Sequence, residues 1–99
     1  MTYFNDRVDS EIHNRTKHIK LIFIETDIFT EDLKTLLSDD EYAEFQSYLA
    51  ENPLIGDVIQ QTGGLRKVRW SAKGKGKRSG VRIIYYYVLP DSQIRLLLI

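Results

Sequence analysis

The sequence has no cysteine, only two prolines and no long apolar run. Without cysteine the fold has neither disulfides nor thiolate zinc ligands, and cysteine nucleophiles are excluded. Runs such as Leu21–Ile24 and Leu96–Ile99 are far shorter than the roughly 20 apolar residues of a membrane-spanning helix. The first residues mix acids and bases without an apolar stretch, so we expect no secretory signal and a cytoplasmic protein.

The sequence also lacks the ligand sets of a metal or nucleotide site. His13 and His18 have no companion ligands at metal-binding spacing, so we read them as solvated and expect neither a metal nor another cofactor. The glycines fit neither a Walker loop nor a dinucleotide-binding turn. Nucleoside triphosphate chemistry is therefore not expected.

Charge is segregated along the chain although it cancels overall. Lys and Arg number 14, as do Asp and Glu, which gives a formal net charge of zero. Nine of the 14 bases follow Gln61, a stretch in which Asp91 is the one acid. Such asymmetry predicts that the C-terminal part forms a surface for a polyanion.

A chain of 99 residues fits one domain. Residues 1–18 lack a steady period, so we expect a polar arm there, with a helical turn near Val8–Ile12, and a domain over residues 19–99. Segments rich in β-branched and aromatic residues predict strands, and the short connections between the last three favour antiparallel pairing. The predicted strands are Ile19–Glu25, Leu65–Ser71, Val81–Leu89 and Ile94–Ile99.

Two helices are predicted between the first two of these strands. Apolar residues from Ile28 to Leu37 recur at helical spacing, which favours a short amphipathic helix ending near Ser38. Ser38 and Glu41 then form the pattern of a capping box, so a second helix begins there. Pro53 limits that helix. The fold class is therefore α+β, with a strand and a helical hairpin packed on an antiparallel sheet.

Basic residues gather in the two central predicted strands and in the loop between them. The period of two places Lys67 and Arg69 on one strand face, and Arg82 on the adjacent strand can join them. The loop 71–80 alternates glycine with lysine, so its backbone can approach a phosphate closely, although a charged hairpin tip can also serve solubility alone. We expect phosphate contacts from Arg66, Lys73, Lys75, Lys77 and Arg78.

Aromatic residues lie beside this basic set. Trp70 and the three tyrosines at 85–87 can stack on bases in single-stranded RNA. Aromatics at alternating strand positions more often fill a core, so we assign Tyr85 and Tyr87, or else Tyr86, to packing. We expect one or two of these rings at most to contact RNA.

The stretch from Gly56 to Ile99 resembles the core of HigB-type toxins of the RelE/ParE superfamily. The likeness is carried by GDVIxxTGGLRK, the basic loop and RIIYY, and EYAEFQSYLAENP is similar to the second helix of that family. The resemblance covers about residues 20–99. It implies a RelE-like fold, with a twisted antiparallel sheet packed against a helical hairpin, and a cognate helix-turn-helix antitoxin of HigA type.

The resemblance also implies an activity. Toxins of this type are metal-independent endoribonucleases that cut messenger RNA on the ribosome and thereby inhibit translation. By their positions in the strand motifs, Lys67, Arg69 and Arg82 match the basic active-site residues of the family. The implied reaction is attack of a 2′-hydroxyl on its own phosphate, with these cations stabilising the charge that develops.

The sequence departs from the family pattern after Ile99, where relatives continue with an aromatic residue and a closing helix. Two alternatives therefore stay open beside the endoribonuclease. One is a ParE-like gyrase inhibitor, which the abundance of Lys and Arg disfavours. The other is a truncated, non-catalytic module that binds RNA or the antitoxin.

Overall fold

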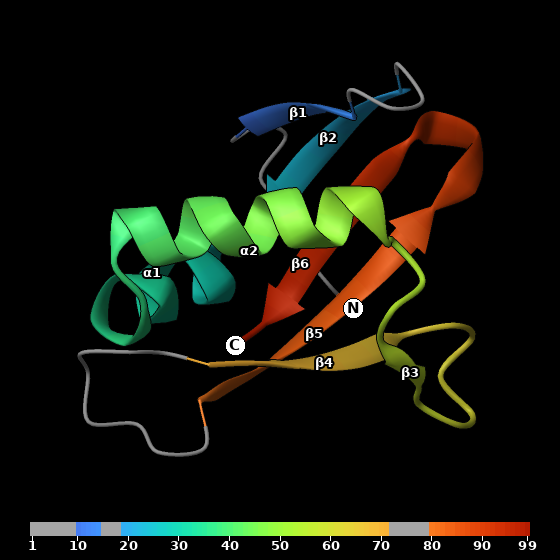
Figure 1. Ribbon diagram of the computed structural model, residues 1–99. Coiled ribbons are helices and arrows are strands. Elements are labelled where there is room, and N and C mark those ends of the chain that lie inside the picture. The colour runs from blue at the N-terminus through green and yellow to red at the C-terminus, as the bar shows by residue number, and fades with distance from the viewer. Residues whose placement is uncertain (1–9, 15–18, 72–79) are drawn as a thin grey trace.

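The computed structural model describes residues 10–14, 19–71 and 80–99. They form an α+β fold with two helices and one mixed six-stranded sheet, whose strand order is β1-β2-β6-β5-β4-β3. Figure 1 shows both helices over one face of this sheet. The elements are β1 Ser10–Asn14, β2 Ile19–Glu25, α1 Asp27–Leu36, α2 Asp39–Glu51, β3 Asp57–Val58, β4 Arg66–Trp70, β5 Val81–Val88, a 3₁₀ turn Leu89–Asp91 and β6 Gln93–Leu98.

The four predicted strands are confirmed, and β4, β5 and β6 pair antiparallel as their short connections predicted. The prediction of a wholly antiparallel sheet is wrong, because β2 lies parallel to β6, with Phe23 opposite Ile94. The chain between β2 and β6 passes through both helices and three strands. A connection of that length can return the chain in either direction, so no short turn dictates the pairing.

Strand β1 lies inside the segment that was expected to be a polar arm. It pairs antiparallel with β2, from Ser10 opposite Phe23 to Asn14 opposite Ile19. The expected helical turn near Val8–Ile12 is therefore wrong over Ser10–Ile12. Pairing with β2 gives hydrogen-bond partners to backbone N–H and C=O groups that a lone helical turn would leave without partners. These five residues thus extend the sheet.

Side-chain caps fix the start of each helix. Thr26 Oγ1 accepts a hydrogen bond from Phe29 N at 3.1 Å and donates to Leu97 O at 2.7 Å, so the cap of α1 is tied to β6. The predicted capping box of α2 is confirmed: Ser38 N donates to Glu41 Oε1 at 2.8 Å, and Glu41 N donates to Ser38 Oγ at 3.1 Å. Such caps satisfy backbone N–H groups that a helix cannot bond internally.

The core lies between the helices and the sheet. Phe29 from α1 and Phe45 and Leu49 from α2 are fully buried against Ile83 and Tyr85 of β5. Ile28, which the helical spacing placed on the apolar face of α1, is instead 61% exposed. Within the described residues neither helix is long and apolar enough to cross a membrane. The sheet face that turns away from both helices is called the outer face below.

Candidate phosphate-binding site

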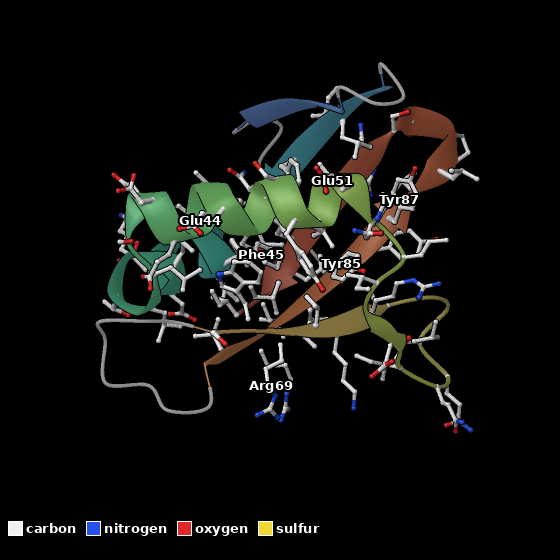
Figure 2. All side chains as sticks on the ribbon, in the orientation of Figure 1. Glu44, Phe45, Glu51, Arg69, Tyr85 and Tyr87 are labelled. Carbon is white, nitrogen blue, oxygen red and sulfur yellow. The ribbon has the colours of Figure 1, made fainter. Side chains whose placement is uncertain are left out.

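Strand alternation places the three predicted catalytic residues on the outer face. In β4, Val68 is buried in the core while Lys67 and Arg69 are exposed. In β5, Ile83 is buried while Arg82 is exposed. Figure 2 shows Arg69 projecting from β4 on the side opposite α2. The predicted division of β4 into a core face and a basic face is thus confirmed.

The register brings these cations together. Arg69 lies directly opposite Arg82 across the β4–β5 pair, and Lys67 lies opposite Ile84. Lys67, Arg69 and Arg82 line one cavity of about 170 Å³ with Asp57 and Val68, and we call this the basic pocket. Like charges directly opposite each other destabilise a sheet. The Arg69–Arg82 pair therefore favours an anion as ligand.

Asp57 is a site residue that the sequence did not single out. It belongs to the two-residue strand β3 and lies opposite Lys67. A strand of two residues is too short to show a period, so the sequence does not predict β3. The sequence signal for Asp57 was its position as an acidic residue shortly before the basic strand β4. The structure gives the basic pocket a carboxylate among three cations.

The segment that carries Asp57 is fixed by hydrogen bonds from β5 and by close packing against β4. The Tyr85 hydroxyl donates to Pro53 O at 2.7 Å and accepts from Gly56 N at 3.0 Å. Burial raises the pKa of Tyr85 above its usual value of 10.0. A Cβ on Gly56 would lie 2.8 Å from Lys67 O, so only glycine fits where the loop meets β4. The position of Asp57 therefore depends on Tyr85 and Gly56.

Arg66, predicted to bind RNA, is placed apart from the three cations. Its Nη1 donates to Gly56 O at 2.7 Å and to Leu54 O at 3.2 Å, and the side chain is half-buried. These contacts hold the loop before β3 and leave Arg66 outside the lining of the basic pocket. The other predicted RNA-binding residues, Lys73, Lys75, Lys77 and Arg78, lie outside the described residues.

The aromatic side chains divide between core and surface. Tyr85 is fully buried, which confirms its assignment to the core, whereas Tyr86 and Tyr87 are half-buried. Trp70 packs edge-on against Phe45, with ring centroids 5.5 Å apart. Trp70 also borders a second cavity, of about 500 Å³, which we call the edge pocket. Its lining residues are Glu41, Glu44, Tyr48, Arg69, Trp70 and Ser71.

The arrangement of the basic pocket suits a phosphodiester. Its cations project from rigid, paired strands, and such preorganised charges can stabilise negative charge that develops on phosphate. Arginine can bond two phosphate oxygens at once, while lysine supplies a mobile point charge. No protein-family model matches the chain.

Proposed function

We propose that this chain is the toxin of a type II toxin-antitoxin system, a metal-independent endoribonuclease that cuts messenger RNA on the ribosome and inhibits translation. The observation that carries the proposal is the convergence of Lys67, Arg69 and Arg82 in one pocket on the outer face, the sheet face away from α1 and α2. The α+β fold with a helical hairpin on one sheet face is compatible with a RelE-like toxin of HigB type.

The proposed reaction uses the RNA itself as nucleophile. The 2′-oxygen bonds to the adjacent phosphorus, the bond from phosphorus to the 5′-oxygen breaks, and the proton of the 2′-hydroxyl is lost while the leaving oxygen gains one. The products are a 2′,3′-cyclic phosphate and a 5′-hydroxyl. Lys67 and Arg69 stabilise the charge on the scissile phosphate, and Arg82, across from Arg69, adds to the positive field.

The proposal also assigns the partners and the location. A ribosomal substrate places the toxin in the cytoplasm, and a helix-turn-helix antitoxin of HigA type is the expected inhibitor. An inhibitor that covers the basic pocket must neutralise its cations, so an acidic segment fits best, and charge complementarity would speed association. Phosphate contacts from Arg66 and from the basic loop remain part of the proposal.

The test is messenger cleavage on translating ribosomes, mapped by primer extension. The chain should produce new 5′ ends in phase with codons, and a Lys67→Ala, Arg69→Ala variant should produce none. Both side chains are exposed, so the variant should fold normally. Lys34→Ala removes an exposed lysine from α1, far from the basic pocket in sequence, and should cleave like the unaltered chain.

Three results would contradict the proposal. The first is a folded chain that yields no new messenger ends. The second is trapped gyrase in a supercoiling assay, which would select the ParE-like alternative. The third is tight binding of ribosomal RNA or antitoxin without any cleavage, which would select a non-catalytic binding module.

A further inference from the structure

The edge pocket lies beside the part of β4 that β3 does not cover. Strand β3 pairs with β4 only at Arg66 and Lys67, so no other described strand pairs with this side of β4 at Arg69 and Trp70. The edge pocket lies between this stretch and α2. Its volume of about 500 Å³ falls in the range of small-molecule sites.

One wall of the edge pocket is aromatic and firmly supported. The rings of Trp70 and Tyr48 have centroids 5.2 Å apart and an interplanar angle of 42°. Phe45, which is fully buried, holds Trp70 from the core side. Tyr48 remains 37% exposed. The supported ring of Trp70 and the accessible ring of Tyr48 give a planar ligand an apolar surface to lie on.

Helix α2, which carries Tyr48, also contributes two carboxylates to the lining of the edge pocket. One oxygen of Glu41 accepts from Ser38 N in the capping box, so that side chain is committed to the helix start. Glu44, one turn further along, is exposed and lines the edge pocket. Figure 2 shows Glu44 and Glu51 on α2, with Glu51 at the C-terminal end of the helix. Glu44 is therefore the acceptor that a ligand can reach.

Arg69 lines both the basic pocket, on the outer face, and the edge pocket, on the α2 side of β4. No described strand pairs with β4 on its β3 side at Arg69, so a ligand can pass around this strand edge from one cavity to the other. We propose that a single nucleotide spans them, with its phosphate in the basic pocket and its base in the edge pocket, and that the base is guanine. This inference rests on the proposed function, because it assumes RNA as the ligand. It adds a base-reading site formed by Trp70, Tyr48 and Glu44.

The chemistry of the lining selects guanine. An ionised carboxylate only accepts hydrogen bonds, and it can receive two parallel ones. Guanine offers adjacent N1–H and N2–H donors on its Watson–Crick edge, whereas adenine, cytosine and uracil each present fewer donors there. Stacking on an aromatic ring is tolerant of sequence, so the rings supply affinity while Glu44 supplies the choice of base.

The neighbouring cations argue against a basic peptide side chain in the edge pocket. Lysine or arginine would suit the aromatic and acidic lining alone. However, Arg69 borders the same cavity, and Lys67 and Arg82 share the adjoining one. A second cation would be repelled there, whereas a nucleotide presents its negative charge toward these residues.

Trp70 makes the proposal directly measurable, because it is the only tryptophan in the chain. The intact chain is titrated with the 5′-monophosphates of guanosine, adenosine, cytidine and uridine, and the fluorescence of Trp70 is followed. Free tryptophan in the same solutions corrects for light absorbed by the nucleotides. Guanosine monophosphate should quench the signal at a concentration roughly tenfold lower than uridine monophosphate does.

Two variants of α2 test the role of Glu44. Glu44→Gln should reduce the preference for guanine to about threefold or less, because an amide N–H would face the donors of the base. Glu51→Gln removes the same charge from an exposed position of the same helix outside the edge pocket, and it should keep the preference. Guanosine without phosphate should bind more weakly than its monophosphate, since it cannot use the basic pocket.

Absence of quenching by every nucleotide would overturn the inference, as would equal affinity for all four bases. Equal loss of the preference in Glu44→Gln and Glu51→Gln would overturn the role of Glu44, and equal binding of guanosine and its monophosphate would overturn the spanning geometry. These results are independent of messenger cleavage. Cleavage without quenching rejects the base site alone, and guanine-specific quenching without cleavage rejects the proposed activity alone.

Discussion

Removing one hydroxyl from the core should measurably destabilise the fold. In Tyr85→Phe the ring still fills its space, but the buried Gly56 N–H loses its acceptor and Pro53 O loses its donor. A buried polar group left without a partner costs about 1–3 kcal/mol. Pro53 O is only partly buried and water can replace part of its bond. We therefore expect a loss of about 2–3 kcal/mol in the free energy of unfolding.

This loss is readily measured by urea unfolding followed by circular dichroism. With a slope of about 1 kcal/mol per molar for a small domain, the midpoint should fall by about 2–3 M while the slope stays constant. The melting temperature should fall by about 10 °C. Tyr87→Phe is the matched control, because Tyr87 is half-buried and no hydrogen bond of its hydroxyl appears among the described residues.

A difference of less than about 0.5 kcal/mol between the unfolding free energies of Tyr85→Phe and Tyr87→Phe would contradict this expectation. Such a result would mean that the Tyr85 hydroxyl does not hold the segment before β3. A destabilised Tyr85→Phe with unchanged messenger cleavage would instead show that the position of Asp57 is unimportant for activity.

Three further outcomes are expected. The pKa of Tyr85 is raised in the folded state, so the contribution of its hydroxyl to stability is fully present below the unfolded value of about 10 and is lost as the pH rises further. The difference in unfolding free energy between the unaltered chain and Tyr85→Phe should therefore narrow above about pH 10, as measured by urea titrations at a series of pH values. Ser38→Ala should lower the free energy of unfolding by about 1 kcal/mol through loss of the capping box, while Ser47→Ala on the exposed side of α2 should change it little in the same assay; equal effects would contradict the role of the cap. Arg82→Ala should reduce the slope of log affinity against log salt concentration for single-stranded RNA by about 0.7, measured by fluorescence anisotropy, and an unchanged slope would show that Arg82 contacts no phosphate.

Local signals in the sequence were sufficient for most of the secondary structure. The capping box of Ser38 and Glu41 predicted the start of α2, and the alternation in β4 predicted which face would carry Lys67 and Arg69. These features depend on neighbours a few residues apart, so the sequence displays them directly. The same alternation explains why Val68 and Trp70 pack toward the core.

Features that depend on distant parts of the chain were not predictable in this way. The parallel pairing of β2 with β6 joins residues about seventy positions apart, and β1 is held in the sheet by its pairing with β2. Asp57 reaches the basic pocket through contacts made by Tyr85 and Gly56, and Arg66 is withdrawn from the pocket by backbone carbonyls. None of these contacts leaves a periodic trace in the sequence.

The place of β6 in the sheet has a consequence for synthesis. Although β6 comes last along the chain among the described strands, it lies between β2 and β5, and among these strands it alone joins the β1–β2 pair to the others. A nascent polypeptide therefore cannot close its sheet until residue 98 has emerged from the exit tunnel. Until then, the β1–β2 pair and the β3–β4–β5 group each have an edge of unpaired backbone groups where β6 will lie.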